Sequence, residues 1–174
     1  MLQLSSAILK VPVLSLRTGD QIAVAIAPII DPKNLKIEGF YCEDSLDGKP
    51  LILLWQDVRE TLPNGFVIDD HERLVEEEEL VRLKEVLRLR FELLGKPVET
   101  AGKEKVGKVS DYAVETESMY IQKIYVKQSF IKNLTGSSLS IDRTQVVEVT
   151  KKAVIIHDTM ETAPAPAPAP TAAA

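Results

Sequence analysis

The sequence predicts an all-β protein made of two tandem small antiparallel β-barrels, joined by a helical linker and followed by an extended tail. Three observations lead to this prediction. The second half of the chain repeats the first, apolar and polar residues alternate with a period of two, and turn-forming residues recur at short intervals. A chain of 174 residues has room for one ordinary domain or two very small ones.

The repeat covers most of the chain. Three blocks follow one another in the same order in both halves, at offsets of 84 to 88 residues: 2–13 with 87–98, 22–45 with 106–129, and 56–70 with 144–158. In the first block, five of twelve positions are identical. Because the order is preserved and the offset changes where turns are expected, we interpret residues 1–70 and 87–158 as two copies of one unit.

Each copy is expected to be a series of short strands. The apolar run 22–30 is too short to cross a membrane, and it is expected to form a buried strand with a bulge or an edge at Pro28. The second copy is expected to open with a half-buried strand over 87–93, where apolar and charged residues alternate. Turn signals separate the strands at 17–20, 47–48, 63–65, 100–102 and 135–136.

The linker over 71–86 is rich in strong helix formers, and Glu76–Glu79 precede Arg82 and Lys84. Acidic residues first and basic residues last suit the helix dipole, so we predict a helix over 71–85. A run of charges is typical of a solvated connector, and an acidic partner site is the alternative interpretation.

The tail over 159–174 consists mainly of alternating alanine and proline. Proline at every second position blocks helices and sheet ladders, and no bulky apolar group is present to build a core. We therefore predict a disordered end. The predicted division of the chain is 1–70, 71–86, 87–158 and 159–174.

Composition and charge exclude several functional classes. A net charge of −5 and a pI near 5.2 argue against a dedicated nucleic-acid binder, so no DNA partner is predicted. One cysteine and two histidines are too few for a disulfide framework or a zinc site, and we predict no metal and no cofactor. The amino terminus lacks a signal-peptide pattern, which predicts a cytoplasmic protein without a transmembrane segment.

No arrangement of residues predicts catalysis. Residues 102–108 match the start of a phosphate-binding loop, but Val109 stands where a magnesium-binding hydroxyl is required. Cys42 is expected to be a buried, inert thiol in a strand. We therefore predict that the protein is not an enzyme. An enzymatic function would need a deep pocket that joins both copies, for example through His71, Asp69 and Asp158.

The second copy carries a recognisable pattern of motifs. A Leu-Gly-x-x-Val segment at 94–98 precedes Gly-Lys-Val-x-Asp at 107–111, and β-rich segments follow at 142–149 and 153–158. This pattern resembles the signature of the PRC-barrel family over essentially all of the second copy, and the first copy follows by the internal alignment. The resemblance implies a small antiparallel barrel, here in tandem, with structural roles for Gly95, Gly107, Lys108, Val109 and Asp111.

The PRC-barrel family is known as a family of versatile adaptors rather than of enzymes. Its members include the cytoplasmic domain of the photosynthetic reaction-centre H subunit and the carboxyl-terminal domain of the ribosome maturation factor. This chain lacks the membrane helix of the first and the different amino-terminal domain of the second. The resemblance therefore implies an interaction role in general and neither of those two functions in particular.

The two copies differ in charge. The first copy carries a net charge of −4 (6 basic and 10 acidic residues), and the second carries +3 (12 basic and 9 acidic residues). In the second copy, a period-two alternation places Lys123, Tyr125 and Lys127 on one exposed strand face, with Tyr125 aligned to Tyr41. A tyrosine between two ammonium groups suits an acidic protein patch, and it also suits RNA phosphates with base stacking. An ordinary exposed strand face is the third interpretation.

Two functions are predicted from this pattern. The preferred one is a non-enzymatic adaptor that binds a protein partner through exposed strand faces, with ribosome-linked assembly as one setting. Its candidate interaction face consists of Lys123, Tyr125, Lys127 and Tyr41. The alternative is an RNA-associated factor that uses a basic strand face of the second copy, extended by Arg88, Arg90 and Lys132. The salt dependence of RNA binding separates the two, because phosphate contacts release counterions.

Overall fold

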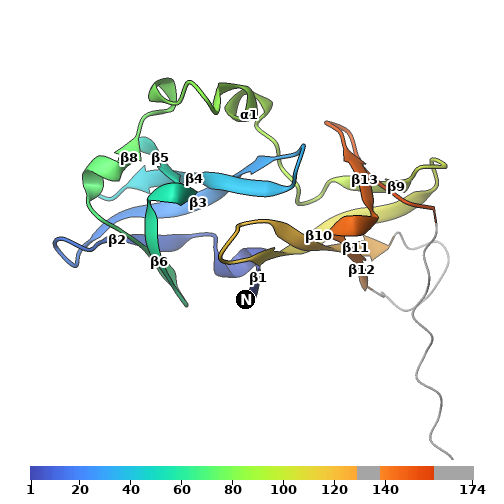
Figure 1. The fold of residues 1–174 in the computed structure, drawn as a ribbon, viewed down its shortest axis with the longest axis horizontal. Coiled ribbons are helices and arrows are strands. Elements are labelled where there is room, and N and C mark those ends of the chain that lie inside the picture. Colours follow the sequence, from blue (N-terminus) through green and yellow to red (C-terminus); the bar gives the residue numbers. More distant parts are fainter. Residues whose placement is uncertain (129–137, 159–174) are drawn as a thin grey trace, which may run out of the picture.

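The structure, a computed structural model, describes residues 1–128 and 138–158. The two copies lie next to each other along the long axis of the molecule, and each is built around a curled sheet (Figure 1). The prediction of an all-β protein is confirmed. The predicted tail and Lys132 lie outside the described residues.

The first copy forms one seven-stranded sheet with the order β6-β7-β2-β3-β4-β5-β8. In chain order its elements are β2 (Val11–Ser15), β3 (Gln21–Asp31), β4 (Lys36–Asp44), β5 (Pro50–Leu54), the 3-10 helix η2 (Trp55–Asp57), β6 (Val58–Leu62), β7 (Gly65–Ile68) and β8 (Leu74–Val75). Neighbouring strands are antiparallel except β2 and β7, which are parallel. This pair brings the opening strand of the copy beside a late one, so the sheet curls. The prediction of a wholly antiparallel barrel is wrong at this pair.

The second copy forms a sheet of the same kind. Its elements are β9 (Pro97–Thr100), β10 (Lys105–Glu115), β11 (Ile121–Gln128), β12 (Ser138–Asp142), η5 (Arg143–Gln145), β13 (Val146–Val149) and β14 (Val154–Ile156). The order is β12-β11-β10-β9-β14-β13, with β9 and β14 parallel. The seventh strand, β1 (Leu2–Leu4), comes from the start of the chain and pairs with β10.

Irregularities in the two sheets fall at aligned positions. The pairing of β3 with β4 shifts register twice, on either side of Pro28. The pairing of β10 with β11 shifts at the two positions that lie 84 residues later. Bulges of this kind bend a strand and increase its twist, so the long hairpin of each copy bends at the same places. The irregularity predicted at Pro28 is therefore found as one register shift before the proline and one after it.

The two copies meet through aligned residues. The backbone N–H of Ile37 donates to the carbonyl oxygen of Met119 at 2.9 Å, and the N–H of Ile121 donates to that of Leu35 at 2.8 Å. Ile37 and Ile121 are 84 positions apart in the chain, and so are Leu35 and Met119. The two hydrogen bonds are therefore equivalent in the two copies. The two long hairpins therefore pair about an approximate two-fold axis, where Leu35 and Met119 are buried.

The leading segment of each copy packs on the other copy. β1 pairs with β10, and the Ser5 hydroxyl in η1 (Ser5–Ala7) donates to the Asp111 carboxylate at 2.6 Å. The aligned segment of the second copy lies on the first sheet, where Leu87 is buried with Ile29 and Ile52. One continuous apolar core contains residues from both copies. The two copies therefore stabilise each other through exchanged segments.

The linker is not a continuous helix. It contains η3 (His71–Arg73), β8, η4 (Glu77–Glu79) and α1 (Lys84–Leu89). The helix predicted over 71–85 is therefore wrong, and the strand predicted over 87–93 is wrong because α1 occupies its first half. Tertiary packing overrides local propensity here. β8 pairs with β5, and the apolar residues that follow it pack around the outer face of the first sheet: Leu80, Leu83, Val86 and Leu87.

Glu115 anchors the end of β10. Its carboxylate accepts hydrogen bonds from the amino-terminal ammonium at 2.9 Å and from the backbone N–H and hydroxyl of Ser118, each at 2.8 Å. These contacts lower the pKa of Glu115 to about 2. A carboxylate with a depressed pKa stabilises the fold above its ordinary pKa of 4.5, and the contribution disappears as the pH falls toward 2.

We therefore expect Glu115→Gln to lower the free energy of unfolding by about 1 kcal/mol at pH 7 and by much less near pH 2. Urea titrations of both proteins at the two pH values measure this difference. An equal loss at pH 7 and pH 2 would show that the charge of Glu115 plays no part.

Candidate functional site

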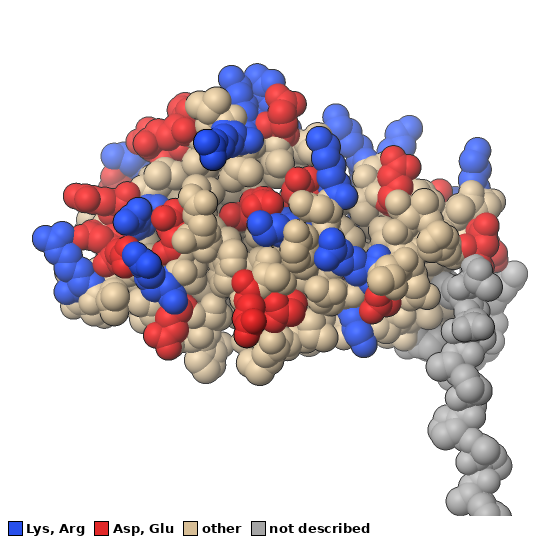
Figure 2. All heavy atoms as spheres, in the orientation of Figure 1, with Lys and Arg blue, Asp and Glu red and all other residues tan. Residues whose placement is uncertain are grey.

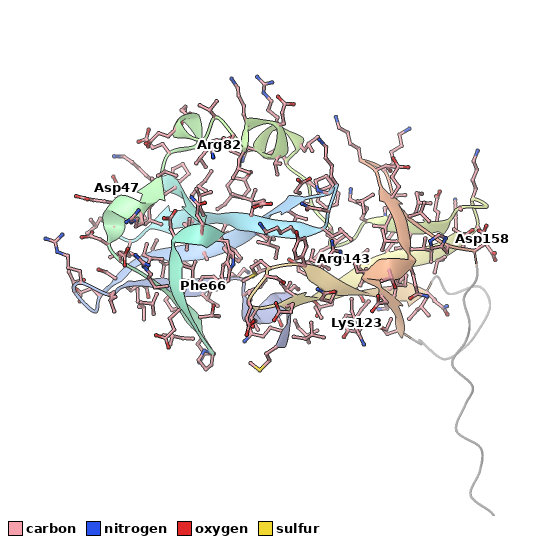
Figure 3. All side chains as sticks on the ribbon, in the orientation of Figure 1. Asp47, Phe66, Arg82, Lys123, Arg143 and Asp158 are labelled. Atoms are coloured by element: carbon pink, nitrogen blue, oxygen red, sulfur yellow. The ribbon has the colours of Figure 1, made fainter. Side chains whose placement is uncertain are left out.

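Three of the residues predicted for the interaction face lie together on β11. Lys123, Tyr125 and Lys127 lie on the outer side of the second sheet, because Ile124 and Val126 between them are buried. Lys127 is exposed, and Lys123 and Tyr125 are half-buried. Figure 3 shows Lys123 on the lower side of the second copy.

Cross-strand neighbours extend this surface onto β10 and β12. Directly opposite residues in antiparallel strands share a face, and each of the three residues on β11 has one partner on either side. We call the resulting surface the β11 face. Its members are Lys108, Asp111, Lys123, Tyr125, Lys127, Ser138, Ser140 and Asp142, whereas the β10 partner of Lys123, Ala113, is buried.

The β11 face is mixed in charge, with three lysines and two aspartates. Lys108 lies directly opposite Lys127, and like charges in this position repel each other. Over residues 1–128 and 138–158, the three lysines form no ion pair. Figure 2 shows acidic and basic side chains intermixed over the visible surface. The local arrangement of charges, rather than a broad field of one sign, therefore determines what this face attracts.

Both aspartates of the β11 face are held by neighbouring donors. Asp111 accepts hydrogen bonds from the Ser5 hydroxyl at 2.6 Å and from the backbone N–H of Tyr112 at 2.8 Å. Asp142 accepts from the N–H and the hydroxyl of Thr144, which lower its pKa together with the nearby charge of Lys123. Asp111 thus fixes η1 beside β10, and Asp142 caps η5.

The aligned face of the first copy is covered by the chain itself. Tyr41, which aligns with Tyr125, lies under the guanidinium of Arg90, 5.0 Å from its ring centroid. Glu77 accepts a hydrogen bond from Arg90 at 2.6 Å. Figure 1 shows α1 above the first sheet, with the segment that leads into it. We call residues 76–90 the covering segment. The structure therefore does not place Tyr41 on the β11 face, and it holds Arg90 over the first copy.

The two faces differ at aligned positions. The first has apolar residues on β5 where the second has polar ones on β12: Ile52 aligns with Ser140, and Leu54 with Asp142. Ile52 is 2% exposed, whereas Ser140 is exposed. In the described part of the chain, β1, η1 and β9 lie beside β10 at the border of the β11 face. The second copy therefore presents an open version of a surface that the first copy closes.

The glycines of the family-like motif have structural roles. Gly95 has a φ of 76°, and its N–H donates to the carbonyl oxygen of Val109 at 2.8 Å. A Cβ at Gly107 would collide with the carbonyl oxygen of Lys127. Val109 is buried and Lys108 is exposed. Of the five motif residues, Lys108 and Asp111 belong to the β11 face.

A groove of about 380 Å³ lies where the copies meet, but it does not hold the residues named for catalysis. It is lined mostly by apolar residues from both copies, with Tyr41, Arg90 and Tyr112 among them. His71 instead pairs with Asp44 at 2.8 Å. Asp69 pairs with Arg59 and Asp158 accepts from the backbone of Gly102, so these three residues are not brought together. Figure 3 shows Asp158 at the far end of the second copy.

Two searches of residues 1–128 and 138–158 concern other kinds of site. No group of three or more His, Cys, Asp or Glu side chains there is arranged to hold a metal ion. None of the helices there has the length and apolar character needed to cross a membrane.

Cys42 lies inside the first copy. It is 3% exposed, and burial raises the pKa of its thiol to about 12. Because the thiolate is the reactive form, we expect iodoacetamide at pH 8 to alkylate the native protein at least about 100-fold more slowly than the protein unfolded in guanidinium. Mass spectrometry over time measures both rates, and equal rates would contradict the burial of Cys42.

A scan against protein-family models finds no matching family for this chain, and a search of curated proteins finds no match. The resemblance of residues 87–158 to the PRC-barrel family therefore stays a prediction.

The structure adds Ser138, Ser140 and Asp142 to the residues that sequence reasoning selected. The last two lie outside the three aligned blocks, and it is the strand registers that match them to Ile52 and Leu54 of the first copy. Their membership of the β11 face follows only from the register that pairs β12 with β11.

Proposed function

We propose that this protein is a non-enzymatic adaptor that binds a protein partner on the β11 face. The observation that carries this proposal is the difference between the two aligned faces. The first is closed by the covering segment, and the second is left open by the residues that the structure describes, with Tyr125 at its centre. A tyrosine on a sheet face offers a large contact area at low cost in conformational entropy, which is typical of the centre of an interface.

The proposal includes the architecture that the sequence suggests. We take residues 1–70 and 87–158 as two PRC-barrel-like units in tandem. The matched register shifts, the matched parallel pairs and the family-like motif support this interpretation. The exchange of leading segments joins the two units through β1 on β10 and Leu87 on the first sheet, which suits a scaffold that presents one face to a partner.

The charges favour a protein over RNA as the partner. A nucleic-acid strand that follows the lysines of β11 would also meet the carboxylates of Asp111 and Asp142. A nucleic acid carries a phosphate at every nucleotide and so meets both carboxylates, whereas a protein segment can place its negative charge at the lysines and a donor at each aspartate. The RNA-associated function is therefore the second candidate, and the experiment separates the two.

A capture experiment tests the proposal with the full chain. Tagged wild-type protein, Lys123→Glu/Lys127→Glu and Lys151→Glu/Lys152→Glu are incubated with native lysate, with and without RNase, and bound proteins are quantified by mass spectrometry. The second double variant changes the charge equally at exposed positions outside the β11 face. We expect a defined protein to bind wild type and this control, and to fall at least about tenfold with Lys123→Glu/Lys127→Glu, regardless of RNase.

Two results would overturn the proposal. If the captured proteins are the same for all three chains, the β11 face is not the binding surface. If capture depends on the lysines but is lost with RNase, the partner is RNA or is bound through RNA.

A further inference from the structure

The first copy shows how this kind of sheet binds a chain segment. β8 pairs with the edge of β5, with Leu74 opposite Leu53 and Val75 opposite Ile52. The chain then continues as the covering segment, whose apolar residues pack around Ile52 and Tyr41. An extended piece on the edge followed by a segment over the outer face is therefore a binding mode that this unit already uses.

Among residues 1–128 and 138–158, no such segment pairs with the corresponding edge of the second copy. β12 aligns with β5 at an offset of 88, and it is the last strand of its sheet in the described part of the chain. An edge strand presents a row of backbone N–H and C=O groups that pair readily with an added strand. A partner can thus enter along β12 as β8 enters along β5.

Charge selects which segment fits. Lys127 replaces Glu43 at the aligned position, and it faces Lys108 across the strands. A carboxylate placed between these two ammonium groups removes their repulsion and accepts charge-assisted hydrogen bonds from both. Asp111 and Asp142 accept hydrogen bonds from Ser5 and Thr144, and within the described part of the chain neither forms an ion pair with Lys108 or Lys127.

The surroundings of Tyr125 favour an apolar partner side chain over its ring. In the first copy, a cation covers the ring of Tyr41, because Arg90 is balanced there by Glu77. Tyr125 has Lys123 and Lys127 on the same face, so an added arginine would be repelled. An aliphatic or proline side chain covers the ring without that cost.

We infer that the β11 face binds an acidic segment of a partner protein, which adds a strand to the edge of β12, places a carboxylate between Lys108 and Lys127, and covers Tyr125 with an apolar side chain. This inference rests on the proposed function and names the class of partner.

A peptide titration tests this inference with the full-length protein. The probe has the sequence of residues 74–83, LVEEEELVRL, and the control peptide carries glutamine in place of the four glutamates. Both peptides are added to ¹⁵N-labelled protein, and the backbone amide signals are followed by NMR. We expect shifts over 123–127 and 138–142, and at least about tenfold weaker binding of the glutamine peptide.

Two variants sharpen the test. Lys108→Glu/Lys127→Glu is expected to weaken binding of the probe at least about tenfold, and Lys151→Glu/Lys152→Glu to leave it within about twofold. Unchanged spectra away from the substitutions show that each variant is folded.

Three outcomes would overturn the inference. Shifts confined to β4 and β5 would mean that the probe displaces the covering segment. An absence of shifts would mean that the β11 face does not take an acidic strand. Tighter binding of a single-stranded RNA oligonucleotide at the same lysines, with a steep salt dependence, would assign the face to RNA.

The inference and the proposed function fail in different ways. Capture of a protein that depends on Lys123 and Lys127, together with a peptide that does not bind, leaves the adaptor function in place and excludes the acidic-strand partner. If neither lysine-dependent capture nor peptide binding is observed, both the adaptor function and the acidic-strand partner are excluded.

Discussion

Replacement of Phe66 by alanine is expected to lower the free energy of unfolding by about 3–5 kcal/mol. Phe66 is 1% exposed, and its ring centroid lies 4.8 Å from that of Phe40 and 6.1 Å from that of Trp55. Figure 3 shows Phe66 among the strands of the first copy. The substitution removes aromatic contacts and leaves a cavity that rigid neighbouring strands cannot fill.

Urea titration followed by tryptophan fluorescence measures this loss, because Trp55 is the single tryptophan of the chain and reports on the same cluster. Val147→Ala is the control. Val147 is 50% exposed, and its replacement is expected to change the free energy by less than about 0.5 kcal/mol.

The Phe66→Ala protein also tests whether the copies unfold together. One core contains residues from both, so signals of buried residues such as Val154 in β14 are expected to disappear at the same urea concentration as the fluorescence change. A second copy that keeps its wild-type midpoint while the first unfolds would contradict a shared core.

The second large effect is expected at Gly107. A Cβ there would collide with the carbonyl oxygen of Lys127, and this oxygen belongs to the strand that pairs with β10. Backbone cannot move aside as the end of a side chain can, so Gly107→Ala is expected to cost about 2–3 kcal/mol. The same displacement disturbs Lys127, and binding of a partner on the β11 face is expected to weaken as well.

The aligned position of the first copy supplies the control for this substitution. Ala23 is buried there and carries its Cβ without strain, so Ala23→Gly is expected to cost only about 1 kcal/mol. Thermal or urea unfolding of both variants measures the difference. A Gly107→Ala protein as stable as wild type would mean that the strands of β10 and β11 lie farther apart than described.

Much of the fold was predictable because it depends on local patterns. The alternation around Lys123 and Tyr125 predicts an outer and an inner face of β11, and both are observed. Pro28 predicts an irregular strand, and register shifts flank it. Such patterns report burial of alternate residues, which is a property of the sequence itself.

The linker and its neighbours were not predictable in the same way. Residues 71–93 have good helix formers and then an alternation, but their conformation is set by the sheet that they cover. Leu87 and Leu93 are buried as the alternation predicts, but Leu89 between them is 37% exposed, because α1 and a loop occupy this segment instead of a strand. Which segment crosses to the other copy is decided by packing between residues far apart in the chain.

The candidate site was predictable only along one strand. Lys123, Tyr125 and Lys127 follow from the period of β11, whereas Lys108, Ser140 and Asp142 join them through pairing registers that a single sequence does not show. Tyr41 looked equivalent to Tyr125 because the alignment cannot reveal that Arg90 covers it.

The exchange of leading segments also has a consequence for how the chain is made. Ser5 and Asp111 are 106 residues apart in the chain, and their hydrogen bond helps to hold β1 in place. At synthesis rates of about 5–20 residues per second, the first strand leaves the ribosome roughly 5–20 s before its partner exists. Likewise, the first sheet emerges before the covering segment that shields Ile29 and Ile52. Folding of this protein is therefore completed only after most of the chain has been translated, and a ribosome that stalls before β10 leaves an unpaired strand and an apolar surface in water.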